Sequence, residues 1–177
     1  MSEPVDFLFL DLETTGLDPT RCAIIEVAAV LTKPNLVPYA SFERLVYPAA
    51  GACWEEVAAG MHAKGDLLRQ LFDHRLYLPA GVEADFTFWL KEQLGETKAH
   101  LAGNSVHFDR GFLKQHMPLV LKHLTHRHLD VTSVRLAAVA AGCPEMPKRE
   151  VAHRAMADID ASLDELRHYL AALKARP

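Results

Sequence analysis

The first long apolar run of the chain ends in two acidic side chains and a glycine. Residues 5–13 read Val-Asp-Phe-Leu-Phe-Leu-Asp-Leu-Glu, and Gly16 follows three residues later. Because apolar residues that favour strands dominate this run, it predicts a buried strand, and the glycine marks the turn that ends it. Alternate residues of a strand share a face, so Asp11 and Glu13 should project from the same side of the sheet.

Two more apolar segments follow after short polar turns. Residues 22–31 are almost continuously apolar, and residues 40–47 alternate between apolar and polar side chains. The sequences Asp-Pro at 18–19 and Lys-Pro-Asn at 33–35 are typical of turns. We therefore expect three strands that are joined as antiparallel hairpins.

The second half of the chain alternates between helical and extended patterns. In its last segment, residues 154–175, apolar side chains recur every three or four positions, as on the buried face of a helix. The other helices are expected at residues 54–59, 63–76, 82–94, 105–116, 119–124 and 132–142, and Thr132 or Ser133 should cap the last of these. The other strands are expected at residues 100–104 and 129–131. This order predicts an α/β fold, a mixed sheet covered by helices, in one domain that spans residues 1–177.

Composition narrows the class of protein. Half of the residues are hydrophobic and 24% are charged, which is the usual balance of a globular protein. No apolar run has the length of a membrane span and no secretory leader is recognisable, so neither a membrane protein nor secretion is expected. Three widely spaced cysteines form no disulfide or zinc pattern, which favours a reducing cytoplasm. The formal net charge of −4 argues against a protein that grips long nucleic acids over its whole surface.

Three more candidate residues join the first acidic pair. Asp109 follows the expected fourth strand, Asp158 lies in the first turns of the last helix, and His153 precedes that helix. Each has an ordinary explanation, since acids favour the starts of helices, strand-end acids can face solvent, and histidines are common on surfaces. Their combination favours a hydrolytic site.

Phosphate chemistry requires such a combination. Four carboxylates can hold two divalent cations about 3.5–4 Å apart, and these ions activate a water and stabilise the leaving oxygen. Mg²⁺ and Mn²⁺ prefer oxygen ligands of this kind. His153, whose side chain titrates near neutral pH, is the natural general base for the water.

Three motifs carry a resemblance to a known family. Residues 11–17 (Asp-Leu-Glu-Thr-Thr-Gly-Leu), the segment around Asp109 and the His153-x4-Asp158 pair resemble the motifs of the DEDDh 3′→5′ exonucleases. More narrowly, the segments Gly-Asn-Ser-Val-His-Phe-Asp-Arg at 103–110 and Arg-His-Leu-Asp-Val-Thr at 127–132 resemble the oligoribonuclease family. The likeness extends over nearly the whole chain.

This resemblance implies a ribonuclease-H-like fold, with a five-stranded mixed sheet whose second strand is antiparallel. It implies a homodimer that degrades very short single-stranded RNA, or DNA of similar length, from the 3′ end to 5′-mononucleotides. Two cations, Mg²⁺ or Mn²⁺, would be held by the four carboxylates, with His153 as the base. The matching metal ligands are Asp11, Glu13, Asp109 and Asp158. Leu17 matches a leucine that inserts between the two terminal bases. The residues that match the contacts to a 5′-phosphate are Ser105, His62, Thr132 and, from the other subunit, Arg127.

Three positions depart from the oligoribonuclease pattern. Thr14 stands where that family has a methionine, His126 where it has a tyrosine, and Thr132 where it has a serine. The alternative function is therefore a DEDDh exonuclease for single-stranded DNA or longer RNA, of the proofreading, repair or RNA-processing type. A non-catalytic nucleotide-binding domain is the alternative of a different class, and the intact set of five catalytic candidates argues against it.

Two groups of basic residues have competing interpretations. His123, His126 and His128 could suggest zinc, but their irregular spacing and the lack of a nearby cysteine favour a basic surface that meets phosphate or a partner subunit. Arg127 could be an ordinary solvated charge, and His62 an ordinary residue at a helix start.

Overall fold

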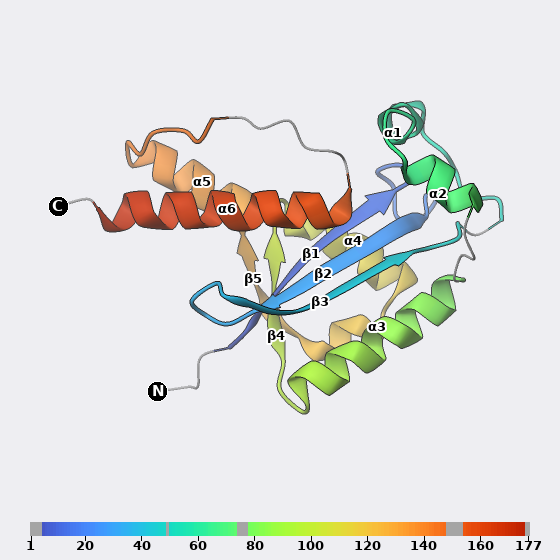
Figure 1. Cartoon of the computed structure of the whole chain (residues 1–177), viewed down its shortest axis with the longest axis horizontal. Helices are drawn as coiled ribbons and strands as arrows, with labels where there is room; N and C mark the ends of the chain where they lie inside the picture. Colours follow the sequence, from blue (N-terminus) through green and yellow to red (C-terminus); the bar gives the residue numbers. More distant parts are fainter. Residues whose placement is uncertain (1–4, 49, 74–77, 148–153, 176–177) are drawn as a thin grey trace.

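A five-stranded sheet forms the centre of the described part of the chain. The computed structural model describes residues 5–48, 50–73, 78–147 and 154–175 (Figure 1). The strands follow the order β3-β2-β1-β4-β5 across the sheet. They are β1 (Phe7–Thr14), β2 (Ile24–Thr32), β3 (Pro38–Leu45), β4 (Ala99–Gly103) and β5 (Leu124–Asp130).

Strand β2 runs opposite to the other four strands. It pairs antiparallel with both β1 and β3, whereas β1 pairs parallel with β4, and β4 with β5. The predicted mixed sheet with an antiparallel second strand is therefore confirmed. Because β1 and β4 are parallel neighbours, their carboxyl ends lie at the same edge of the sheet, and the segments that follow them can meet there.

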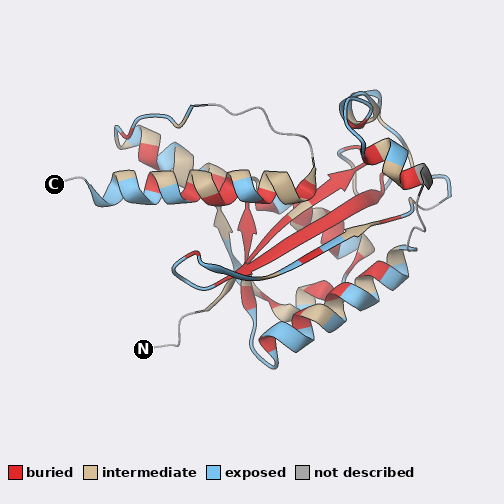
Figure 2. Ribbon diagram, viewed as in Figure 1, coloured by how far each residue is buried: buried red, intermediate tan, exposed pale blue. Residues whose placement is uncertain are grey.

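Helices cover both faces of the sheet (Figure 1). One face carries α3 (Pro79–Leu94), α4 (Val106–His116) and the short 3₁₀ helix η1 (Val120–His123), and the other carries α5 (Val131–Ala140) and α6 (Ala155–Lys174). Helices α1 (Glu56–His62) and α2 (Leu67–Asp73) lie where β1 ends. Figure 2 shows β1 and β2 buried along most of their length. Within the described residues, no helix is both long and apolar enough to cross a bilayer.

Alternation along β1 divides the core between the two faces. Leu10 and Leu12 belong to the apolar cluster that includes α3 and α4, whereas Phe9 belongs to the cluster that includes α6. Asp11 and Glu13 continue the Phe9 side of the strand. The sequence spacing thus correctly predicts that both carboxylates project from one face, and that face is the one covered by α6.

Two predicted boundaries near β5 are wrong. The segment expected as a helix at 119–124 is one turn of 3₁₀ helix, and β5 begins at Leu124 instead of residue 129. The pattern hides this strand because β5 is at the edge of the sheet and several successive residues of it are exposed. The cap of α5 is Asp130, because its Oδ1 atom accepts the backbone N–H of Ser133 at 3.0 Å, so the predicted cap at Thr132 or Ser133 is also wrong.

Smaller boundary shifts occur in the helices before β4. Helix α3 begins at Pro79, earlier than expected, because proline is suited to the first turn of a helix. The helices expected at 54–59 and 63–76 correspond to α1 and α2, and the end of the second lies outside the described residues.

Candidate active site

Asp11, Glu13 and Asp158 come together beside the carboxyl end of β1. The first two project from β1, and Asp158 lies in the first turn of α6, which packs on the same face of the sheet. One carboxylate oxygen of each residue lies within 4.8 Å of the others. Carboxylates from opposite ends of the sequence therefore form one acidic cluster.

Asp109 approaches this cluster from the neighbouring strand. It lies in the first turn of α4, the helix that follows β4, and is only 4% exposed. After burial itself, the charge of Asp109 is the largest cause of the raised pKa of Asp11, so the two carboxylates are close neighbours. The structure thus brings the four predicted carboxylates to the edge where β1 and β4 end.

Burial and mutual repulsion raise the pKa values of these carboxyl groups. Burial, followed by the charges of Asp109 and Asp158, raises the pKa of Asp11 to about 9. Burial and the charge of Asp158 raise the pKa of Glu13 to about 7, and burial raises the pKa of Asp109 to about 8. Without a counter-ion the cluster therefore retains protons that isolated carboxyl groups release at neutral pH.

A divalent cation fits this cluster. Its donors are all carboxylate oxygens, the ligands that hard cations prefer, and they converge closely enough to share an ion. A cation would also compensate buried negative charge that is otherwise costly. His153, the predicted base, lies outside the described residues, and Arg154, which follows it in the sequence, is the first residue described in this region.

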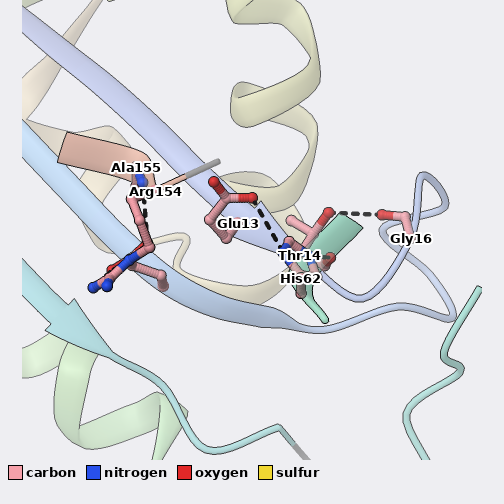
Figure 3. Close-up of polar contacts among 7 residues, drawn as sticks. Glu13, Thr14, Gly16, His62, Arg154 and Ala155 are labelled. Carbon is pink, nitrogen blue, oxygen red and sulfur yellow. Dashed lines mark hydrogen bonds and ion pairs between the residues drawn. The ribbon is translucent and has the colours of Figure 1, made fainter. Parts of the chain in front are cut away.

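His62 lies next to Glu13, at the end of α1. Its ring is 3% exposed, with Nε2 at 2.9 Å from the carbonyl oxygen of Thr14 and Nδ1 at 3.7 Å from Oε2 of Glu13 (Figure 3). The ordinary alternative, a helix-start residue, is wrong because His62 is the last residue of α1. The imidazole is therefore part of the wall of the acidic cluster.

Leu17 lies in the turn that follows β1. Its side chain is 72% exposed, and its backbone N–H donates to Oε2 of Glu55 at 3.1 Å. The Thr14 hydroxyl donates to the Gly16 carbonyl oxygen at 2.8 Å (Figure 3), and a Cβ on Gly16 would lie 2.5 Å from Cδ of Glu55. Glycine is therefore required for this close approach. Sequence reasoning missed Glu55, because a single acid before a helix gives no signal of a contact with a distant turn.

Ser105 and Thr132 meet beyond the ends of β4 and β5. Their hydroxyl oxygens are 3.5 Å apart. The Thr132 hydroxyl also donates to Oδ1 of Asn104 at 2.9 Å, and the amide nitrogen of Asn104 donates to Oγ of Ser162 on α6 at 2.9 Å. This chain of hydrogen bonds links both predicted phosphate contacts to the helix that carries Asp158.

A cavity of about 700 Å³ opens from the acidic cluster along α6. Asp11 and Asp158 line one part of it, and Arg135, Met146 and Tyr169 line another. Pockets of this size with mixed apolar and polar walls are typical of small-molecule sites. The space beside the carboxylates is thus large enough for a nucleotide.

Arg127 lies exposed on β5, at the edge of the sheet, between the exposed residues His126 and His128. Burial, followed by the charges of Arg127 and His126, lowers the pKa of His100 on the neighbouring strand. Arg127 and its two histidine neighbours thus lie on the edge strand, whereas Asp11 and Glu13 lie on β1.

Comparisons with known proteins agree with this arrangement. The family model described as Exonuclease matches residues 8–166. The oligoribonuclease of Pseudomonas paraeruginosa is 33% identical over 178 aligned positions, which cover 96% of each chain. The mitochondrial oligoribonuclease of Mus musculus is 32% identical, over 92% of this chain and 70% of the mouse protein.

Solved structures show the same fold. The E. coli exonuclease I complex with single-stranded DNA, in its zinc-bound form, aligns with a TM-score of 0.71 at 16% identity, over 98% of this chain. This chain spans about two fifths of that enzyme, since 42% of it is covered. The residues matched by the family model, 8–166, include the acidic cluster from Asp11 to Asp158. The chain belongs to the exonuclease family and, within it, to the oligoribonucleases.

Proposed function

We propose that this site removes nucleotides from the 3′ end of very short RNA, dinucleotides and slightly longer, and releases 5′-mononucleotides. The observation that carries the proposal is the cluster of Asp11, Glu13 and Asp158, to which Asp109 adds the charge that raises the pKa of Asp11. The Pseudomonas oligoribonucleases align with this chain over 96% of their own length. Clustered carboxylates of this kind, three of which have raised pKa values, are suited to metal-assisted phosphodiester hydrolysis.

The four carboxylates would hold two divalent cations, Mg²⁺ or Mn²⁺. When bound, such ions polarise the scissile phosphate and compensate the charge that develops on it. The raised pKa values of Asp11 and Asp109 support this assignment, because groups that repel each other when ionised favour cation binding. Glu13 and Asp158 contribute from the two elements that face each other.

His153 would accept the proton of the attacking water. An imidazole is suited to this task because its pKa lies near neutral pH. In the sequence it directly precedes Arg154, the residue after which α6, the helix that carries Asp158, begins. In-line attack on the phosphate then releases the terminal nucleotide as a 5′-monophosphate and leaves a 3′-hydroxyl on the shortened strand.

Substrate contacts would come from several sides of the cluster. Leu17 is exposed at the end of β1, where it can insert between two bases, and His62 offers Nδ1 beside Glu13. Ser105 and Thr132 offer hydroxyl groups to a 5′-phosphate. Arg127 lies exposed on the edge strand, from which it would contact the 5′-phosphate of a substrate in the other subunit of a homodimer.

A length ladder tests this function. Labelled RNA of two to seven nucleotides and DNA of the same lengths would be digested with Mg²⁺, with Mn²⁺ and with a chelator. We expect RNA dinucleotides to be cleaved fastest and all cleavage to stop with the chelator. Faster cleavage of DNA or of the seven-nucleotide RNA would instead favour a general DEDDh exonuclease, the function that Thr14 in the first motif is compatible with.

Two controls complete the experiment. Asp158→Ala should abolish cleavage while the protein stays folded, and Asp66→Ala, at an exposed residue paired with Arg69, should leave it unchanged. A parent protein that binds oligonucleotides but cleaves none with either metal would be the non-catalytic binding domain. Sedimentation of the parent protein measures whether it is a dimer.

A further inference from the structure

Glu26 is a fully buried carboxylate beside the acidic cluster. It lies on β2, is 0% exposed, and stands directly opposite Glu13 in the antiparallel pairing of β1 and β2. Directly opposed residues of an antiparallel pair project from the same face of the sheet, so Glu26 also faces α6. Its position next to the cluster could suggest a fifth metal ligand, but its hydrogen bonds indicate a structural role.

Donors from the start of α6 occupy both oxygens of Glu26. Arg154 donates from Nε and Nη2 to Oε1 at 2.9 and 2.6 Å, and the backbone N–H of Ala155 donates to Oε2 at 3.0 Å. Figure 3 shows Arg154 and Ala155 at the beginning of this helix, near Glu13. Because both oxygens of the Glu26 carboxylate accept hydrogen bonds from the protein, we do not expect it to bind a metal ion.

Among the described residues, no other side chain caps the start of α6. Arg154 is the residue that precedes α6, and its own side chain makes no capping hydrogen bond. The Glu26 carboxylate, from a strand far away in the sequence, therefore satisfies the first helical N–H and complements the positive end of the helix dipole. Removal of this carboxylate would leave both Ala155 N–H and the guanidinium of Arg154 without their acceptor.

We propose that Glu26 is a positioning residue, which fixes the start of α6 and thereby the place of Asp158 relative to Glu13. The proposal rests on the function given above. The backbone N–H of Asp158 donates to the carbonyl oxygen of Arg154 at 3.0 Å, so the residue that Glu26 holds is also the one that anchors the Asp158 backbone. In the sequence, Arg154 directly follows His153, so the same contact holds the chain next to the proposed base.

Arg154 also influences the charge of the cluster. Burial and the charges of Asp158 and Glu26 raise the pKa of Glu13, and Arg154 opposes them. A second carboxylate, Glu43 on β3, lies 3.8 Å from the Arg154 guanidinium but is 46% exposed. Glu26 and Glu43 thus both contact the guanidinium group of Arg154, but only Glu26 also caps α6. Glu43 is therefore a matched control.

Two measurements on the purified full chain test the proposal. Calorimetry measures the binding of MnCl₂, and steady-state kinetics measure the hydrolysis of an RNA dinucleotide. Glu26→Gln keeps the shape of the side chain, but its amide must turn an N–H toward a donor. We expect about 10–100-fold weaker Mn²⁺ binding and a similar loss in kcat, the usual effect of losing a group that orients metal ligands. The KM should change less than about 3-fold, and Glu43→Gln should stay within about 3-fold of the parent in every measurement, as for an exposed ion pair.

Parent-like Mn²⁺ affinity and kcat in Glu26→Gln would overturn the proposal. Should circular dichroism show that this variant does not fold, Arg154→Lys provides the second test, because it keeps the charge and loses the two-pronged hydrogen bond. We expect weaker Mn²⁺ binding there as well, and parent-like binding would equally overturn the proposal. A parent protein that binds Mn²⁺ but cleaves no oligonucleotide would reject the proposed function alone, since the Mn²⁺ affinities of the variants can still be compared.

Discussion

The Nδ1 atom of His62 lies 3.7 Å from Oε2 of Glu13, and no other described residue gives that nitrogen a hydrogen bond. The Nε2 atom faces the carbonyl oxygen of Thr14, which can only accept, so Nε2 carries the ring proton. In a neutral ring the lone pair of Nδ1 therefore points at a carboxylate. A proton donor between these two acceptors, such as a hydroxyl group of the substrate, would complete this side of the site.

His62→Ala is expected to lower kcat/KM on an RNA dinucleotide about 10–100-fold, the effect typical of groups next to metal ligands. It should also reduce the free energy of unfolding by about 1–3 kcal/mol, because the buried oxygen of Thr14 loses its donor. Steady-state kinetics and thermal unfolding measure the two effects. His168→Ala, at a partly exposed residue in the second half of α6, is the control. A His62→Ala variant with parent-like kcat/KM would show that the imidazole has no part in the reaction.

Asp11→Asn should separate activity from stability. We expect kcat to fall about 10³-fold or more, because a central ligand of the cluster is lost. In metal-free buffer at pH 8 the folded chain keeps the Asp11 carboxyl group protonated, whereas the unfolded chain releases that proton. Asparagine removes this cost of folding, so the free energy of unfolding should rise by about 1–2 kcal/mol and Tm by about 2–8 °C. Calorimetry with a chelator measures the gain, and Asp66→Asn provides the exposed control. A lower Tm for Asp11→Asn under these conditions would contradict the repulsive arrangement of the four carboxylates.

The stability of the metal-free protein should fall as pH rises from 7 to 9. Burial and neighbouring charges raise the pKa of Asp11 from 3.8 to about 9, and burial raises that of Asp109 from 3.8 to about 8. In this window the folded chain binds more protons than the unfolded chain, so each rise in pH favours unfolding through these groups. Added Mg²⁺ should raise Tm most at pH 9, where protons compete least with the cation. Thermal unfolding across this pH range, with chelator or MgCl₂, measures both slopes, and a chelator-treated protein whose Tm rises with pH would refute the prediction.

Leu17→Ala should weaken substrate binding without affecting the fold. The side chain is 72% exposed, so the free energy of unfolding should change by less than about 0.5 kcal/mol. Loss of its apolar contact with the bases should raise KM on a dinucleotide about 5–20-fold, which corresponds to about 1–2 kcal/mol, while kcat changes less. Val37→Ala, which shortens another exposed apolar side chain far along the chain, is the control for kinetics and calorimetry. Equal KM values for Leu17→Ala and the parent would exclude the wedge role.

The sequence predicts those elements whose burial follows a regular period. The apolar run before Asp11 places the correct face against the core. The three-and-four spacing of residues 154–175 does so for Ile159, Leu163 and Leu166, whereas Leu170 and Leu173, expected on the same buried face, are exposed near the end of the helix. Strand β5 has no such period, because an edge strand exposes successive polar side chains to solvent. Its start at Leu124 therefore escapes prediction, and so does the cap at Asp130 that follows it.

The candidate site divides in the same way. The four carboxylates belong to short motifs in which type and spacing carry information, so the sequence can single them out. The structure brings Asp11, Glu13 and Asp158 into one cluster, and the role of the four as metal ligands stays a prediction. Glu26 and Glu55 act through single contacts with residues far away in the chain, Arg154 and Leu17, and no local spacing encodes such contacts. The role of His153 stays a prediction from its motif, since this residue lies outside the described part of the chain.

The position of Asp158 in the last helix has a consequence for the synthesis of this protein. A ribosome adds α6 after every strand of the described sheet, so a nascent chain that ends before it already carries Asp11, Glu13 and Asp109 but lacks the fourth carboxylate. In such a chain Glu26 has no partner from Arg154 or Ala155 either. A growing chain therefore carries all four carboxylates, and both donors to Glu26, only after α6 has been added.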